Sequence, residues 1–400
     1  MDGFGLECRL LQKKALGIGL SMQQNHMTLF VTARLGMLVL CALLLGGCAG
    51  VDVIKGKLNY DLRPEGERSA VFWPPAPDTP RYRYVGELVG QPNFIADKAD
   101  DAKSTAITIL KWIVGLFDSS SDVMLARPQH GAVADDGRVY VVDAGRNALV
   151  VFDPNALAED GQASGEGQML VWEYVDGNTR FASPISVAMV WDGTIAVTDA
   201  KLGMVVRLDR SGKLISKLGV GLLQRPTGIA FDRDGGQLFV ADSAAHDIKV
   251  FDSAGRLIRT IGGPGEGAAQ FNAPTQLAFG RGRLYVSDTL NSRVQIFDAD
   301  GQRVSGFGER GLYVGNLTRP KGVAVDNNAG IVYVIESYYA HLLAYSEKGE
   351  YLLGINGSGL QNGQFFLPSG VWTDNDGRLF VADMFNGRVV VFQFLGNTEI

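Results

Sequence analysis

Short stretches in which apolar and polar residues alternate recur along the last two thirds of the chain. One example is the run RLYVSD, SRVQIFDADG and QRVSGFG within residues 283–308. A period of two indicates β-strands, because successive side chains of a strand point to opposite faces of the sheet. Clusters such as DDG, DRDGG and DNDG separate the stretches, and tight turns favour Asp, Asn and Gly. The pattern therefore predicts an all-β fold of short strands joined by turns.

These strands belong to a unit that occurs six times between Pro128 and the C-terminus. Each copy opens with a proline, and its second strand ends in a carboxylate 14 to 16 residues later. The prolines, spaced 42 to 56 residues apart, are Pro128, Pro184, Pro226, Pro274, Pro320 and Pro368. The carboxylates are Asp143, Asp199, Asp242, Asp288, Glu336 and Asp383. Three positions before each proline lies a large apolar residue: Leu125, Phe181, Leu223, Phe271, Leu317 and Phe365. Repeats of this length built from short strands are typical of β-propellers, so we predict a propeller of six blades.

The sixth copy ends at VVVFQFLG and has no residues left for a fourth, outer strand. The segment YRYVGELVG, from Tyr82 to Gly90, is similar to the outer strands LIRTIGG and YLLGING of other copies. We therefore expect it to complete blade six, which would remove the exposed edges of an open array. The predicted propeller domain spans residues 81–400.

The repeats resemble those of the NHL-repeat family. The best matches are RPTGIAFDRDGGQLFVADS and LYVSDTLNSRVQIFDADG, and the resemblance covers residues 128–394. It implies the six-bladed propeller fold but no single activity, because members of this family bind proteins or RNA or catalyse different reactions. Blade two departs most from the family pattern, and blade five has Glu336 in place of the usual Asp.

The N-terminal segment predicts export. Arg34 precedes an apolar stretch at 35–45, and the motif LGGC occupies 45–48. An apolar run of this length followed by small residues is typical of a secretory signal peptide and is short for a membrane-spanning helix. The LGGC motif resembles a bacterial lipobox. The alternatives are an ordinary signal peptide or an uncleaved anchor.

The lipobox resemblance implies that residues 1–47 are a signal peptide and that Cys48 becomes the acylated first residue. The n-region begins at Met27, which we expect to be the true translation start. Ala49 follows the cysteine, and by resemblance to lipoprotein sorting this favours the outer membrane, with the protein facing the periplasm. Membrane attachment would then depend on the N-terminal lipid.

Two further segments precede the first repeat. Residues 48–80 hold five prolines, which predicts a semi-rigid tether between the lipid and the propeller. Apolar residues at helical spacing predict an amphipathic helix inserted at about 96–117. We expect this helix to pack on the side or base of the propeller. The alternative is a helix that docks on a membrane surface or a partner, which Lys111 and Trp112 support.

Composition narrows the chemistry. The net charge of −6 at pH 7 gives no general reason to expect a nucleic-acid partner. Cys8 and Cys41 precede the cleavage position, so the mature chain would keep only Cys48 and would have no disulfide. The sequence contains no Walker loop, G-x-S-x-G elbow, HExxH or C-x-x-C motif. We therefore predict no cofactor, no metal and no catalytic residues.

The carboxylates have two possible roles. Asp232 with Asp234, and Asp374 with Asp376, form DxDG turns that resemble the start of a calcium loop, but the glutamate expected at position 12 is missing. We expect plain hairpin turns there. The strand-end carboxylates recur in every blade, so we expect them to accept backbone N–H groups of the following loop rather than to form a ring of metal ligands.

A binding site on a repeat scaffold should lie where the repeats differ. In a propeller the connection before each opening proline and the loop between the second and third strands open on one face, which we call the proline face. We call the opposite face, with the turns between first and second strands, the turn face. The residues aligned after the prolines are His130, Ile185, Thr227, Thr275, Lys321 and Ser369. The candidate binding residues are Arg127, His130, Arg146, Lys201, Arg225, His246, Asn291, Arg319, Lys321, Tyr338 and Tyr339.

This set predicts a cationic, aromatic proline face, whereas the turn face is predicted to be acidic. Such a surface suits an acidic envelope protein, or an anionic or glycan ligand. In the alternative interpretation, the arginines only brace neighbouring loops.

An enzyme remains the other hypothesis, because some propellers are metal-dependent lactonases or lyases. The amidating lyase that resembles NHL proteins holds zinc with a Pro-His-Gly type motif in three blades. Only His130, in Pro-Gln-His-Gly, is similar here, and one ligand does not make a zinc site. We therefore predict a non-catalytic binding module, with a metal-dependent hydrolase or lyase as the alternative.

Overall fold

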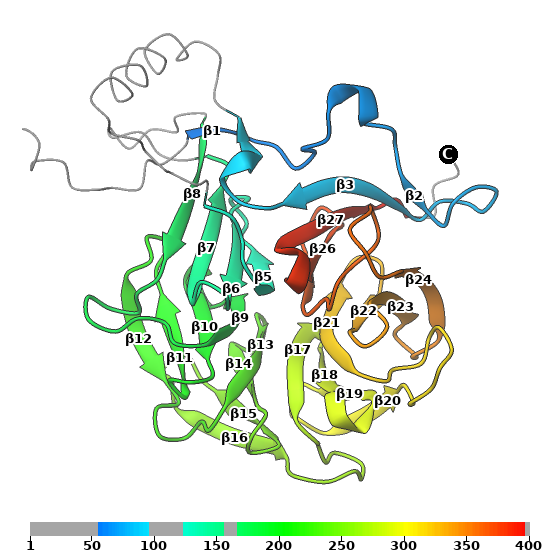
Figure 1. The fold of residues 1–400 in the computed structure, drawn as a ribbon. Helices are drawn as coiled ribbons and strands as arrows, with labels where there is room; N and C mark the ends of the chain where they lie inside the picture. Colours follow the sequence, from blue (N-terminus) through cyan, green and yellow to red (C-terminus); the bar gives the residue numbers. More distant parts are fainter. Residues whose placement is uncertain (1–54, 96–122, 156–165, 397–400) are drawn as a thin grey trace, which may run out of the picture. The chain divides into compact units, whose positions relative to one another are not determined.

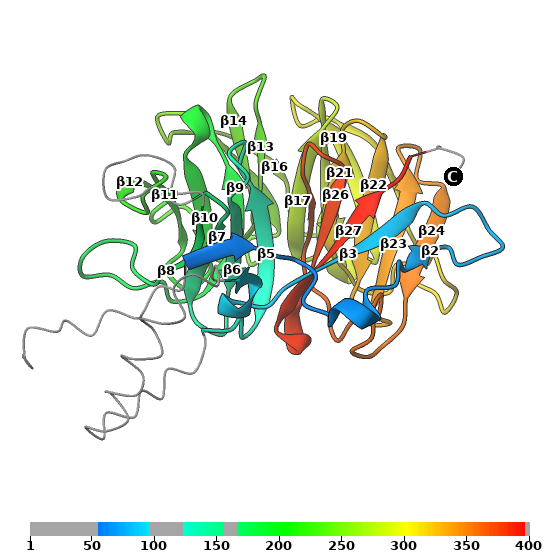
Figure 2. The same ribbon diagram turned by 90° about the horizontal axis from the view of Figure 1, so that it is seen from above.

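The computed structural model describes residues 55–95, 123–155 and 166–396, all of which belong to one compact unit, 54–400. Six β-sheets are arranged as blades around a centre (Figure 1). In the perpendicular view of Figure 2, the strands run between two faces that carry the loops. The prediction of an all-β, six-bladed propeller is confirmed.

The blades contain the following strands. Blade one has β5 (Pro128–Val133), β6 (Val139–Asp143), β7 (Ala148–Asp153) and β8 (Gly167–Trp172). Blade two has β9 (Pro184–Met189), β10 (Ile195–Asp199), β11 (Met204–Leu208) and β12 (Leu214–Leu218). Blade three has β13 (Pro226–Asp232), β14 (Gln237–Asp242), β15 (Asp247–Phe251) and β16 (Leu257–Gly262).

Blade four has β17 (Pro274–Gly280), β18 (Arg283–Asp288), β19 (Arg293–Asp298) and β20 (Arg303–Phe307). Blade five has β21 (Pro320–Asp326), β22 (Ile331–Glu336), β23 (His341–Ser346) and β24 (Tyr351–Asn356). Blade six has β25 (Val371–Thr373), β26 (Arg378–Asp383) and β27 (Arg388–Phe394), and β3 (Tyr82–Leu88) and β2 (Phe72–Trp73) complete it. Neighbouring strands within the blades are antiparallel.

The large apolar residue three positions before each opening proline is part of the hydrophobic core. Six clusters of buried apolar side chains fill the blades and the spaces between them, and each cluster contains one of these residues. Phe271 and Phe365, for example, are fully buried. Because burying a Leu or Phe contributes about 1.5–3 kcal/mol, these residues stabilise the packing of one blade on the next.

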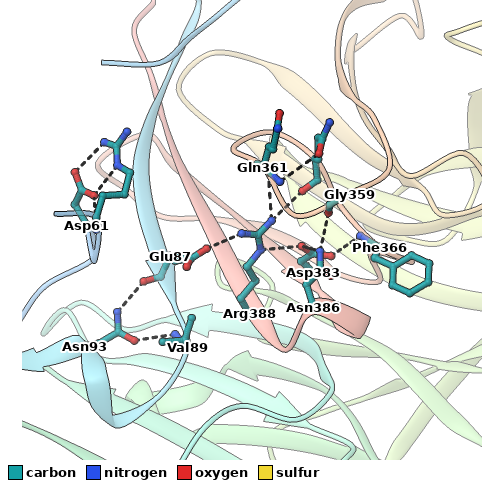
Figure 3. Close-up of polar contacts among 12 residues, drawn as sticks. Asp61, Glu87, Val89, Asn93, Gly359, Gln361, Phe366, Asp383, Asn386 and Arg388 are labelled. Carbon is teal, nitrogen blue, oxygen red and sulfur yellow. Dashed lines mark hydrogen bonds and ion pairs between the residues drawn. The ribbon is translucent and has the colours of Figure 1, made fainter. Parts of the chain in front are cut away.

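The chain closes the ring as predicted. Strand β3 pairs antiparallel with β27, from Leu88 opposite Val389 to Tyr82 opposite Phe394. An ion pair supports this pairing, because Arg388 Nη1 lies 2.8 Å from the Glu87 carboxylate (Figure 3). Strand β3, which precedes all six repeats in the sequence, therefore covers the edge of β27 that the last repeat leaves open.

Residues 55–80, which the prolines predicted to be part of a tether, instead lie on the propeller. Strand β1 (Lys55–Leu58) pairs with β8 of blade one and with β4 (Phe94–Ile95), and β2 pairs with β3. Between them Glu87 N donates to Tyr60 O at 2.8 Å. The segment gains backbone hydrogen bonds on two blades, which an extended tether could not make.

The described residues also include short 3-10 helices: η1 (Glu65–Glu67), η2 (Gln91–Asn93), η4 (Trp191–Gly193), η5 (Thr289–Asn291) and η6 (Met384–Asn386). In the part of the chain that the structure describes, no helix has both the length and the hydropathy of a membrane span. The predicted signal peptide, the predicted lipidation site Cys48 and the whole of the helix expected at about 96–117 lie outside the described residues.

Candidate functional site

Buried carboxylates hold the loops of the proline face in place through hydrogen bonds. Asp143, at the end of β6, accepts the backbone N–H groups of Ala126 (2.6 Å), Arg127 (2.9 Å), Gly145 (2.8 Å) and Arg146 (3.1 Å). The first two precede the opening proline and the last two follow the second strand. One carboxylate therefore fixes two loops side by side, which places both on the same face as predicted.

The same contacts recur around the ring. Asp199 accepts four backbone N–H groups in blade two, and Glu336 accepts those of Arg319, Tyr338 and Tyr339 in blade five. The expected structural role of these carboxylates is thus confirmed. It extends further than expected, because they also bind the loop that precedes the blade.

Blades four and six replace some of these amides by side chains. Asn386 and Arg388 both donate to Asp383, and Asn386 Nδ2 also donates to Gly359 O (Figure 3). Asn291 and its neighbour Arg293 make the matching contacts with Asp288 and Gly265 O in blade four. Asn291, a candidate binding residue, is therefore engaged within its own loop.

Four of the predicted cationic residues lie exposed on the proline face. These are Arg127, Lys201, Arg225 and Arg319. Tyr338 is also exposed, at 62 %, and its ring packs edge-on against Tyr339, which in turn stacks on His341. The loops of blade five thus present an aromatic group beside Arg319.

Other candidates are partly buried and already bonded. Arg146 Nε donates to Met124 O, and His246 Nδ1 accepts the N–H of Ala273. Lys321 is half-buried, and burial together with the nearby Arg319 lowers its pKa. These side chains are less available to a ligand than the exposed arginines.

His130 does not lie among the loops of the proline face. It is buried in β5, opposite Val142, as Ser186 of blade two lies opposite Thr198. The sequence alignment with Ile185 was therefore wrong by one position, because pairing places His130 in register with Ser186. Burial lowers the pKa of His130 to about 4, so the ring is neutral at pH 7.

The first strands of all six blades line a central channel of about 210 Å³. Most of the residues that line it are apolar, and His130 is one of the polar ones. Ser186 Oγ lies 3.0 Å from His130 Nδ1 and 3.2 Å from Gln276 Oε1. These contacts link the first strands of blades one, two and four. No sequence pattern indicates them, because Ser186 and Gln276 come from repeats that look unrelated at this position.

The proline face also carries apolar side chains that were not among the predicted site residues. Phe366 and Phe385 are about half exposed, with ring centroids 5.6 Å apart. Leu290 occupies in blade four the place of Phe385 in blade six, at the centre of a short 3-10 helix, and is also exposed. A comparison of the loops between second and third strands could have found Leu290 and Phe385, since blades one, two and three carry the small or charged residues Gly145, Lys201 and Ala244 at the same position.

The turn face shows no metal-ligand arrangement among the residues that the structure describes. Asp232 Oδ1 accepts the N–H of Asp234, and Asp374 Oδ1 accepts that of Asp376, so both DxDG segments are the expected hairpin turns. Across residues 55–95, 123–155 and 166–396, no group of three His, Cys, Asp or Glu side chains could hold a metal ion.

Comparison with known proteins supports the repeat assignment. Residues 223–251 match the NHL repeat. No curated protein matches the sequence. A structural genomics protein of unknown function from Bacteroides thetaiotaomicron has 14% identity and a TM-score of 0.51, with 67% of this chain and 70% of that chain covered.

Two further solved structures have the same general likeness. Virginiamycin B lyase from Staphylococcus aureus has 14% identity and a TM-score of 0.48, with 68% of this chain and 96% of that chain covered. Hydrazine synthase from Kuenenia stuttgartiensis has 15% identity and a TM-score of 0.46, with the same coverage. At such identities a likeness concerns the fold and not the activity. The protein is therefore a six-bladed β-propeller that contains an NHL repeat.

Proposed function

We propose that this protein is a lipoprotein of the bacterial cell envelope whose propeller binds a partner protein on the proline face and catalyses no reaction. The observation that carries the proposal is the composition of that face. Exposed Tyr338, Phe366 and Phe385 lie on the same face as exposed arginines. Protein interfaces are enriched in aromatic residues and arginine, so this surface fits a protein better than a small ligand.

The charge of the face selects an acidic partner. Arg127, Arg225 and Arg319 are all exposed and each directly precedes an opening proline. Cationic groups at equivalent positions of three blades attract an acidic surface and increase its association rate. The apolar side chains would then supply most of the affinity once the surfaces meet.

The anchor rests on the LGGC motif at 45–48. Seven residues lead from Cys48 to Lys55, where β1 begins. A segment of this length spans at most about 25 Å. An acylated Cys48 would therefore keep blade one close to the bilayer, and the partner would be an envelope protein found near the outer membrane.

Affinity capture tests the proposal. The mature propeller is used to capture proteins from envelope extracts, and the captured proteins are identified by mass spectrometry. A variant with Arg127, Arg225 and Arg319 all changed to Glu should lose the partner, and the parent's capture should weaken with added salt. Its melting temperature should change little, because an exposed charge contributes about 0–1 kcal/mol.

A matched control reverses three exposed cations in the turns between third and fourth strands: Lys213, Arg256 and Lys348. This variant has the same net charge as the first and should keep the partner. If both variants captured the same amount of partner, the proline face would not be the interface.

A further inference from the structure

The turn face is hollowed around the mouth of the central channel. One cavity, of about 630 Å³, lies between blades two and three and is lined by Trp191, Arg207, Arg210 and Phe231. A second cavity, of about 600 Å³, involves the turns of blades one and six. Ligand pockets typically have volumes of about 300–1,000 Å³. Both cavities have the size of a small-molecule site, and the sequence predicted only acidic turns here.

Arg233 lies where these spaces meet. Among the residues that the structure describes, it borders the blade two–three cavity, the second cavity and the channel alike. Arg233 follows Asp232, whose buried carboxylate fixes the turn by accepting the N–H of Asp234. The fold therefore fixes the backbone of Arg233 at the junction of these three spaces and leaves its side chain largely exposed.

The guanidinium of Arg233 is available to a ligand. Within the described residues, its ion pair is with Asp135, at 3.8 Å, which is too long for a hydrogen bond. Both side chains are well exposed, at 63% and 62%. Such an exposed pair contributes little, so an incoming anion could replace Asp135 at low cost.

The other two arginines of the blade two–three cavity are held in place. Arg207 lies over the ring of Trp191, 5.1 Å from its centroid, and Nε donates to Thr194 Oγ1. Arg210 Nη1 pairs with Asp136 at 3.0 Å. Trp191 is itself fixed, because Nε1 donates to Gly236 O. These contacts form a wall with an aromatic part. Its three arginines outnumber the two carboxylates, Asp135 and Asp192, that also line the cavity.

We propose that the turn face binds a small carboxylate-bearing molecule, whose carboxylate pairs with Arg233 in the blade two–three cavity. Arginine presents N–H groups in a planar fork that matches a carboxylate. Arg207 adds a second positive charge to the cavity wall, whereas the charge of Arg210 is balanced by Asp136. Trp191 and Phe231 offer apolar contact to the rest of the ligand. This site is separate from the partner surface on the proline face and does not depend on it.

Calorimetric titration with citrate, as a simple polycarboxylate probe, tests this site. The parent protein should bind citrate saturably. Arg233→Gln should weaken the affinity by about tenfold or more, a factor that corresponds to about 1.4 kcal/mol. Arg256→Gln, which removes an exposed arginine of the same face that borders none of these cavities, should bind as the parent does.

Two further variants locate the bound probe. Trp191→Phe should weaken citrate binding, whereas the proline-face variant with Arg127, Arg225 and Arg319 changed to Glu should leave it unchanged. No saturable binding by the parent, or equal affinity in parent and Arg233→Gln, would overturn the proposal. Loss of binding in the proline-face variant alone would also overturn it, and none of these outcomes bears on partner capture.

Discussion

Arg388 joins two strands that are 301 residues apart in sequence, through an ion pair between its Nη1 and Glu87 at 2.8 Å. The same guanidinium donates from Nε to Asp383, which is fully buried, and from Nη2 to Gln364 O. Strand closure and the loop structure of blade six therefore depend on one side chain (Figure 3).

Arg388→Met should lower the free energy of unfolding by about 3–5 kcal/mol, because it leaves the buried Asp383 carboxylate without its cation. Burial raises the pKa of Asp383 even with Arg388 present, so protonation can relieve part of the cost. We expect a smaller loss at pH 5 than at pH 8, measured by urea denaturation. Glu87→Gln, which removes only the more exposed partner, should cost about 1 kcal/mol or less; similar losses in both variants would contradict this division.

Gly86 is needed where the N-terminal segment crosses β3. Its φ is +150°, and a Cβ would lie 2.1 Å from Tyr60 O. Gly86→Ala should therefore displace residues 59–61 from β3 and cost about 1–3 kcal/mol. Faster hydrogen exchange at Glu87 N–H would report the displacement. Gly66 provides the control, because a Cβ there would have no other heavy atom within 4 Å, and Gly66→Ala should leave stability unchanged.

The repeats explain why most of the fold could be predicted. Each opening proline and strand-end carboxylate occurs six times, so an error in one copy is corrected by the others, as for Glu336 of blade five. The closing strand was found because Tyr82–Leu88 resembles other outer strands. Strand β1 was not found, since KGKL is short and its partners in β8 and β4 are fixed by tertiary pairing rather than by local pattern.

The site was harder to predict because it depends on single positions. Alignment of Gly131 with the glycine of Pro-x-Gly in other blades made His130 look like a surface residue. Strand pairing instead places Gly131 in register with Ile229, and His130 faces the channel. Likewise, the alternation of apolar and polar residues along a strand does not show which turns leave a cavity between neighbouring blades. The hollow around Arg233 therefore has no signal in the sequence.

Because His130 is buried at the channel, the free energy of unfolding should depend on pH. Its pKa is lowered to about 4 from 6.5, so the unfolded chain takes up the proton at a higher pH than the folded one. Stability is therefore fully present above pH 6.5 and is lost as the pH falls towards 4, by about 3 kcal/mol. His130→Gln should remove this part of the pH dependence in denaturation curves at pH 7, 5.5 and 4. Parallel curves for parent and variant would show that His130 is not the group responsible.

Metal removal tests the enzyme alternative. The three histidines that follow the proposed cleavage position are engaged separately: His130 with Ser186, His246 with the N–H of Ala273, and His341 against the ring of Tyr339. We expect the purified protein to contain well under one zinc or calcium ion per chain by elemental analysis. Chelation should leave its melting temperature unchanged. A stoichiometric ion would instead favour a metal-dependent hydrolase or lyase.

Cys48 should decide where the protein is found. If acylation of this residue is the only anchor, Cys48→Ser should abolish labelling with a radioactive fatty acid and release the protein from the membrane fraction. The released variant should keep the melting temperature of the parent's propeller, because β1 begins only at Lys55. Ala49→Asp provides a second variant, which should keep the lipid label but shift the protein from the outer to the inner membrane. Labelling of Cys48→Ser at the parent's level would refute the lipid anchor, and membrane association without label would point to an uncleaved N-terminal segment.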